Sequence, residues 1–194
     1  MIYLASQSPR RRELLDQIGV PHQTLSAPVD ETPQADESPE DYVQRLAVAK
    51  AQSGYASLGS SAGDHPVLGA DTVVVLDGHI LGKPRDREHG IAMLNALAGR
   101  EHRVLTGVAL VSDAGVAYRL SDNRVSFRPL GKAEIAAYWD SGEPLDKAGG
   151  YAVQGLGAMF ISHLSGSYSG VMGLPLFETA ELLSHAGLNP LGNG

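Results

Sequence analysis

The chain contains no cysteine among its 194 residues. A disulfide framework, a thiol nucleophile and a cysteine-based zinc site are therefore excluded. Apolar runs are short as well, and none approaches the ~20 consecutive residues needed to span a bilayer. The first residues also lack the basic segment followed by an apolar segment that is typical of a signal peptide. We therefore expect a cytoplasmic protein that does not bind membranes.

Excess positive charge is also missing, because 22 acidic residues outnumber 15 basic ones and the formal net charge is −7. Non-specific binding to nucleic acid favours a basic surface, so we expect no nucleic-acid partner. If the protein binds a polyanion, its basic side chains must be concentrated locally.

What is present is the composition of a globular protein, with 43% hydrophobic and 19% charged residues. A chain of this length can form one well-buried domain or a two-lobed one, but it is short for two independent domains of ordinary size. No internal repeat is visible. We therefore expect residues 1–194 to form a single domain with one site.

Strand and helix signals alternate along the chain, which indicates the α/β class. Helices are expected at 8–18, 38–53, 87–98, 132–141 and 176–186. Strands are expected at the apolar start of the chain before the first helix, and at 22–27, 67–77 with a break at 69–72, 79–81, 103–112, 116–127 and 159–163. Segments 56–65 and 142–157 are expected to be loops, and 191–194 a frayed end.

The opening segment leads from an apolar strand into a helix start that carries hydroxyls and arginines. Ser8 has the features of an N-cap and Pro9 those of the first helical residue. The free amides of that turn make an anion its natural ligand. The alternative is a solvated basic helix face, although the position at a strand-to-helix junction favours a ligand. Arg10 and Arg11 lie in the first turn, whereas Arg12 is rotated further round and is expected to be exposed.

Two charged residues stand at positions that should be buried. Asp71 lies inside an apolar strand, where an unpaired carboxylate would be costly. It must pair with a cation, bind a metal or face a cleft, and the neighbouring Gly69 and Thr72 favour a functional role. Lys50 emerges from the apolar stripe of its helix. Its ammonium either extends along the surface to water or reaches a buried anion.

Six short motifs follow one another in order along the chain, and together they are far more specific than any one alone. They are Ser6-x-Ser8-Pro9-Arg10-Arg11, Arg45-Leu46-Ala47-x-x-Lys50-Ala51, Gly69-Ala70-Asp71-Thr72, Lys83-Pro84, Asp146-Lys147-Ala148-Gly149-x-Tyr151-x-x-Gln154-Gly155, and Gly166-Ser167-Tyr168 with Gly173-Leu174-Pro175. With this set, the chain from Ile2 to about Gly187 resembles the Maf family of nucleoside triphosphate pyrophosphatases.

The resemblance implies a two-lobed α/β fold similar to that of the inosine triphosphate pyrophosphatases. Such a fold has an elongated mixed β-sheet, and its site lies in the cleft between the lobes. The family hydrolyses the α–β phosphoanhydride of a nucleoside triphosphate to a monophosphate and pyrophosphate, using a divalent metal cation, Mg²⁺ or Mn²⁺. A homodimer is a further expectation that comes from the family alone.

The resemblance also implies roles for individual residues. The position of Asp71 carries the catalytic base, and Glu31 matches a family carboxylate, so both are candidate metal ligands. Because an ordinary Asp, with a pKa of about 3.9, is a weak base at neutral pH, metal assistance to the attacking water should be the larger effect. The residues expected to hold the triphosphate are Ser8, Arg11, Lys50 and Lys83.

Specificity is expected at three positions that differ between branches of the family. Arg10, Thr72 and Gln154 are the combination of the branch that acts on dTTP and UTP, whereas the branch that acts on 7-methyl-GTP has Trp, Gln and Glu. Thymine and uracil share an imide edge with an acceptor–donor–acceptor pattern. A neutral amide such as Gln154 can both donate to such an edge and accept from it.

Two other functions are compatible with parts of the sequence. A nucleotide-binding regulator of cell division without turnover would keep the same basic residues. A sugar-phosphate nucleotidyltransferase also begins with an apolar strand and a basic turn. It should have a glycine-rich loop where this chain has Ser6-Gln7-Ser8-Pro9, which makes it the weaker alternative.

Overall fold

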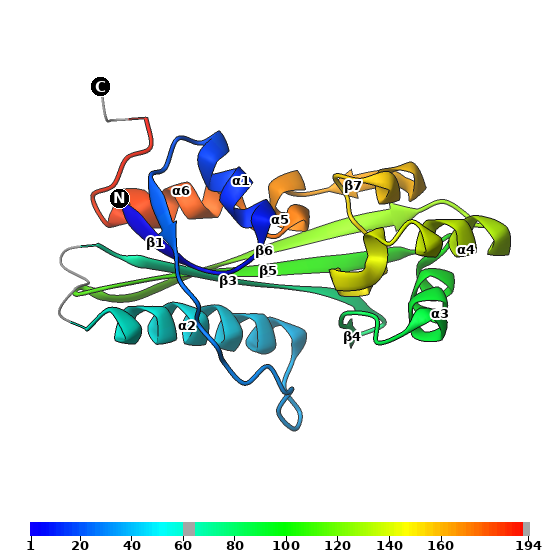
Figure 1. The fold of residues 1–194 in the computed structure, drawn as a ribbon, viewed down its shortest axis with the longest axis horizontal. Coiled ribbons are helices and arrows are strands. Elements are labelled where there is room, and N and C mark those ends of the chain that lie inside the picture. Colours follow the sequence, from blue (N-terminus) through cyan, green and yellow to red (C-terminus); the bar gives the residue numbers. More distant parts are fainter. Residues whose placement is uncertain (60–64, 192–194) are drawn as a thin grey trace.

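The computed structural model describes residues 1–59 and 65–191, which form one mixed β-sheet covered by helices (Figure 1). The strands are β1 Ile2–Ala5, β2 His22–Thr24, β3 Val67–Leu76, β4 His79–Leu81, β5 Glu101–Ser112, β6 Gly115–Phe127 and β7 Ile161–Ser165. The helices are α1 Pro9–Gln17, α2 Pro39–Leu58, α3 Arg87–Leu97, α4 Lys132–Asp140, α5 Tyr168–Met172 and α6 Leu176–His185. Short 3-10 turns lie at Glu143–Asp146, Ala148–Gly150 and Leu156–Phe160.

The sheet runs in the order β2-β1-β3-β5-β6-β7, with β4 paired to β3 outside this path. β1 is parallel to both β2 and β3, while the other pairs are antiparallel. The hairpin of β5 and β6 keeps one register from Ser112↔Gly115 to Glu101↔Ser126, which makes the sheet long. Figure 1 shows α2 on one face and α1, α5 and α6 on the other. The predicted α/β class with an elongated mixed sheet is confirmed.

On one face of the sheet, two separate hydrophobic cores share the long strands. Leu68 and Ala70 of β3 pack with α1 and α6, whereas Val74 and Leu76 pack with α3 and α4. Side chains alternate along a strand, so these four residues point to the same face of the sheet. Thr72 points to that face as well and lies between the two cores. The middle of β3 is therefore the boundary between these two cores.

Helix α2 packs unusually close to the other face of β3. A β-carbon added to Gly69 would lie 2.4 Å from the carbonyl oxygen of Ala47 and 2.6 Å from the amide nitrogen of Ala51. Gly69 thus allows the backbone of α2 to approach the strand. The predicted break at 69–72 is wrong, because β3 continues straight through these residues.

Helix α2 also continues beyond its predicted end at residue 53. Gly54 is a buried contact residue, and a β-carbon there would lie 3.0 Å from Val67 and 3.1 Å from Ala5. It serves packing and does not end the helix, which runs on to Leu58. The loop predicted at 56–65 is therefore wrong for 56–58, and its residues 60–64 lie outside the described residues.

Several other boundaries shift, while the turn signals hold. The strand predicted at 159–163 begins at Ile161, since a 3-10 turn occupies 156–160 and buries Phe160. The strand predicted at 22–27 ends at Thr24, and the loop predicted at 142–157 contains 3-10 turns. Gly19 and Gly99 follow their helices with φ of 66° and 68°, as glycine near a helix C-terminus often does.

The end of the chain allows only part of its prediction to be checked. Leu191 is 96% exposed, while residues 192–194 of the predicted frayed end lie outside the described residues. Over 1–59 and 65–191, no helix combines the length and the apolar character needed to cross a bilayer.

Gly69→Ala should lower the free energy of unfolding by about 1–3 kcal/mol, because the added methyl group collides with the backbone of α2. Urea denaturation followed by circular dichroism measures the change. Gly131→Ala is the matched control, since a β-carbon there meets nothing within 4 Å. Equal stability of the Gly69→Ala variant and the wild type would contradict the close-packing argument.

Candidate functional site

The candidate site lies where β3 has an open edge. β1 pairs with β3 no further than Gly69, and β4 pairs with it only from Val74 onward. Among the described residues, no strand pairs with 70–73 along this edge. Asp71 and Thr72 occupy the opening, and a cavity of about 760 Å³ lies against them. The cavity therefore lies beside the part of β3 that separates the two hydrophobic cores.

All nine residues that were predicted from the sequence line this single cavity. They are Ser8, Arg10, Arg11, Glu31, Lys50, Asp71, Thr72, Lys83 and Gln154. Five basic and three acidic side chains line it in total, which leaves a local surplus of positive charge in a chain whose net charge is −7. The basic groups are therefore concentrated as binding of a polyanion would require. The individual roles of the nine residues stay predictions.

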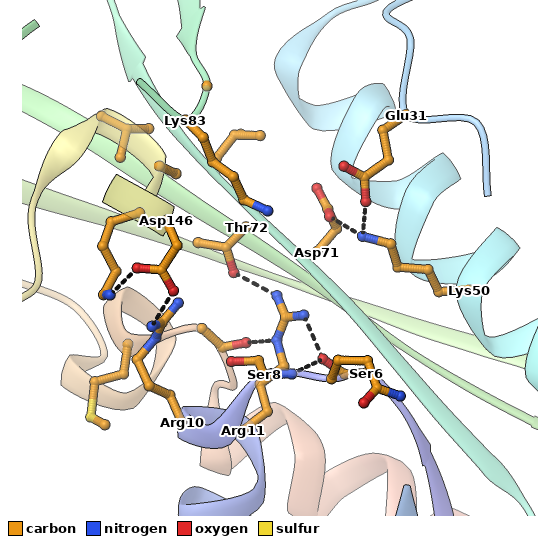
Figure 2. Close-up of a pocket in the computed structure, with 18 of the residues that line it drawn as sticks. Ser6, Ser8, Arg10, Arg11, Glu31, Lys50, Asp71, Thr72, Lys83 and Asp146 are labelled. Carbon is orange, nitrogen blue, oxygen red and sulfur yellow. Dashed lines mark hydrogen bonds and ion pairs between the residues drawn. The ribbon is translucent and has the colours of Figure 1, made fainter. Parts of the chain in front are cut away.

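Lys50 joins the two carboxylates of the site (Figure 2). Its Nζ atom lies 2.7 Å from Oδ1 of Asp71 and 2.6 Å from Oε1 of Glu31. Of the two alternatives for Lys50, the ammonium therefore reaches a buried anion. Asp71 is only 8% exposed. Of its three alternatives, it pairs with a cation and also faces the cavity.

The two carboxyl groups respond differently to this environment. Burial raises the pKa of Asp71, and the opposing effect of the Lys50 charge does not cancel the rise. Burial also acts to raise the pKa of Glu31, but the hydrogen bond and charge of Lys50 outweigh it and the net shift is downward. Asp71 is thus the stronger proton acceptor of the pair.

Asp71 and Glu31 are also the residues that could hold a metal. Within 1–59 and 65–191, no group of three or more His, Asp or Glu side chains is arranged to hold an ion by itself. Two carboxylates do suit a hard cation such as Mg²⁺, which keeps several waters and takes further oxygen ligands from phosphates. The donor set therefore fits a metal that arrives with a phosphate ligand.

The loop that carries Glu31 is fastened to α2 by two residues whose role the sequence analysis missed. The Tyr42 hydroxyl donates to the backbone oxygen of Glu31 at 2.8 Å. Arg45 donates to both carboxylate oxygens of Glu37, at 2.5 and 2.8 Å. The signal in the sequence was that Arg45 stands in the same motif as Lys50. Arg45 holds the loop through Glu37, and Lys50 pairs with the carboxylate of Glu31 in that loop.

Arg11 links the opening turn to β3 and to the segment after α5 (Figure 2). Its guanidinium donates to the carbonyl of Gly173 at 2.7 Å, to Ser6 Oγ at 3.1 Å and to Thr72 Oγ1 at 3.2 Å. Burial lowers its pKa, although the nearby Asp71 charge opposes the shift. Three of its five N–H groups thus bind protein atoms, a positioning task that was not foreseen.

The rest of the opening turn follows the prediction in part. Ser8 is the N-cap and Pro9 begins α1, but the Ser8 side chain makes no capping hydrogen bond. Arg10 approaches Asp146, with Nη1 3.8 Å from Oδ2. Arg12 is exposed as expected. The turn therefore divides its arginines between the cavity and solvent.

The loop that carries Gln154 is held on both sides of that residue. Tyr138 donates its hydroxyl to Glu143 at 2.6 Å, and its oxygen accepts from the amide of Ala152 at 3.2 Å. Glu143 accepts from the amide of Leu156 at 2.8 Å. Sequence alone did not indicate this pair, because neither residue lies within the six motifs.

Comparison with known proteins shows the family of the chain. The family model described as "Maf-like protein" matches residues 1–186. A dTTP/UTP pyrophosphatase of Alkalilimnicola ehrlichii is 62% identical over 94% of this chain and 91% of the relative. A dTTP/UTP pyrophosphatase of Saccharophagus degradans is 54% identical over 94% and 87%. A crystal structure of a nucleoside-triphosphatase, a dITP/XTP pyrophosphatase from Mycobacterium abscessus, aligns over 65% of this chain and 73% of that one, with 20% identity and a TM-score of 0.43.

Lys50→Met should destabilise the protein more at pH 7.5 than at pH 4.5. Without the ammonium, the folded-state pKa of Asp71 rises further above its unfolded value, and a group with a raised pKa costs stability as the pH increases. The expected loss at pH 7.5 is about 3 kcal/mol, typical of an uncompensated buried charge. Urea titrations at both pH values measure it.

Lys147→Met is the matched control, since Lys147 pairs with the exposed Asp146. Its effect should stay within about 1 kcal/mol at both pH values. A loss for Lys50→Met that is the same at pH 4.5 and pH 7.5 would show that the paired carboxylates do not depend on this cation.

Proposed function

The chain belongs to the Maf-like protein family, and we propose on this basis that it hydrolyses dTTP and UTP to the monophosphate and pyrophosphate. The observation that carries the proposal is the meeting of all nine predicted residues in one positively charged cavity, around a buried carboxylate. Two relatives with 62% and 54% identity are named for this activity. Modified pyrimidine triphosphates are further candidate substrates, and removal of such nucleotides from the pool is the proposed purpose.

The reaction needs an oriented water and neutralisation of charge on the leaving group. A water oxygen attacks the α-phosphorus, the bond from that phosphorus to the bridging oxygen breaks, and pyrophosphate leaves. Asp71 accepts the proton of the water, and its raised pKa makes it a better base than an ordinary Asp at neutral pH. The charge on pyrophosphate is met by Arg11, Lys50 and Lys83.

A divalent cation is part of the proposal. Asp71 and Glu31 would hold Mg²⁺ or Mn²⁺ together with phosphate oxygens, and the ion would neutralise charge and make a bound water more acidic. Ser8 would bind phosphate beside them through its hydroxyl, which the helix does not use as a cap.

The base is proposed to lie between the lobes, near Arg10, Thr72 and Gln154. These side chains come from three separate elements of the cavity lining, namely α1, β3 and the loop held by Glu143. Gln154 is exposed and hence accessible to a ligand. Its amide would donate and accept along the imide edge of thymine or uracil.

The remaining expectations from the sequence join the proposal. We infer a cytoplasmic homodimer without nucleic-acid or membrane partners. The acidic net charge supports the lack of a nucleic-acid partner, and the absence of cysteine suits a reducing compartment.

Asp71→Asn should lower the turnover number for pyrophosphate release from dTTP by at least about 100-fold, since the base is lost. Binding of a non-hydrolysable dTTP analogue, measured by calorimetry, should change far less. Asp16→Asn, at an exposed carboxylate of α1, is the control. Undiminished release by Asp71→Asn would show that Asp71 is not the base. A wild type that binds dTTP without releasing pyrophosphate would indicate a regulator.

Replacing Arg10 by Trp, Thr72 by Gln and Gln154 by Glu together should lower kcat/KM for dTTP and UTP by about tenfold or more, because hydrogen bonds to the imide edge are lost. Steady-state pyrophosphate release measures both substrates. Arg12→Trp tests the exposed arginine of the same turn and should leave kcat/KM intact. Unchanged values for the triple variant would mean that these positions do not select the base.

A further inference from the structure

A chain of hydrogen bonds runs from the cavity to helix α5 through two threonines that lie side by side on strands β3 and β5. Thr72 and Thr106 are paired in the register of these strands, and their Oγ1 atoms are 2.9 Å apart. Thr106 Oγ1 donates in turn to the carbonyl oxygen of Gly170 at 2.7 Å. Thr72 lines the cavity, whereas Thr106 is fully buried.

Counting protons fixes the direction of every bond in this chain. A hydroxyl has one proton to donate and two lone pairs that accept. Thr106 uses its proton on the Gly170 carbonyl, which can only accept. Thr106 must therefore accept from Thr72, and the only hydroxyl proton of Thr72 is donated to Thr106.

Arg11 constrains the same hydroxyl from the other side. Its Nη2 atom donates to Thr72 Oγ1 at 3.2 Å, which uses one lone pair. A ligand in the cavity can then meet only the remaining lone pair of Thr72. Toward the ligand, Thr72 is an acceptor without a proton to give.

The Gly170 carbonyl oxygen is also held within its own turn, where it accepts from the amide of Gly173 at 3.1 Å. Ser167 is the N-cap of α5 and accepts from the Gly170 amide at 3.0 Å. A β-carbon at Gly170 would lie 2.7 Å from Ser121 Oγ, so glycine lets α5 lie directly against the sheet. The acceptor that orients Thr106 is thus held by the fold itself.

We propose that Thr106 is a positioning residue for base selection, because it takes the only proton of Thr72 and makes the site select a ligand N–H group there. The inference rests on the proposed function, in which Thr72 lies near the base. Thymine and uracil carry an N–H at the ring nitrogen of the imide edge, whereas the same nitrogen of cytosine has only a lone pair. Two lone pairs facing each other repel, so cytosine is rejected.

The test compares Thr106→Val with Thr106→Ser. Valine keeps the shape of the side chain but removes the hydroxyl, so the Thr72 proton is free to turn toward the ligand. The ratio of kcat/KM for dTTP to that for dCTP should fall about tenfold in Thr106→Val, the usual scale for one hydrogen bond in a buried site. Thr106→Ser keeps the hydroxyl and should keep the ratio.

Binding gives a second readout that does not depend on turnover. Calorimetry with dTMP and dCMP should show the same loss of discrimination in Thr106→Val and its retention in Thr106→Ser. A merely structural role for Thr106 would weaken both nucleotides alike and leave their ratio unchanged. If Thr106→Val does not fold, Thr106→Ala removes the hydroxyl without placing a methyl group against polar neighbours, and the same ratios are measured.

The outcomes separate this inference from the proposed function. If a folded variant that lacks the Thr106 hydroxyl keeps the ratio of kcat/KM for dTTP to that for dCTP, the inference is overturned. The proposed pyrophosphatase function is not affected by that result. A wild type that releases no pyrophosphate from dTTP overturns the proposed function, while the binding ratios still decide the role of Thr106.

Discussion

The contact between Lys50 and Asp71 is the interaction on which the rest of the site depends. It links α2 to β3 and, through Glu31, to the acidic loop before α2. The ammonium can reach the strand because Gly69 lets the helix backbone come close. An isolated carboxylate at Asp71 would be costly in this buried place, and the cation offsets that cost without abolishing the raised pKa. The same pair therefore links the helix to the strand and leaves at the cavity a carboxylate whose pKa is raised.

The open edge of β3 explains why the cavity lies at this point. On this edge of β3, β1 pairs only as far as Gly69 and β4 pairs only with residues from Val74 onward. In the part of the chain that the structure describes, the residues of β3 between them have no neighbouring strand on this edge. Successive residues in the opening face opposite sides of the sheet, so Asp71 meets α2 while Thr72 meets Arg11. The two residues thus have different partners on the two faces of one strand.

Local signals predicted most of the elements, and their failures have physical causes. The cap at Ser38 was foreseen and is observed, with its side chain accepting from the Asp41 amide at 3.1 Å, because a cap depends on neighbours in sequence. Gly54 looked like a helix end and is instead a packing contact with a distant strand. The strand expected at 159–163 began two residues late, since the preceding turn is held by Glu143. Each error involved a contact that lies far away along the chain.

The sequence by itself determined eight of the nine predicted residues that line the cavity, because these eight stand in the six motifs and only Glu31 came from the family resemblance. It also indicated that Asp71 must pair with a cation, bind a metal or face a cleft, since an unpaired carboxylate in a core is costly. Only the tertiary structure decided that the cation beside Asp71 is Lys50. It also decided that Arg11 donates hydrogen bonds to protein atoms. It alone fixed the proton of Thr72, because the direction of a hydroxyl depends on partners that folding brings together.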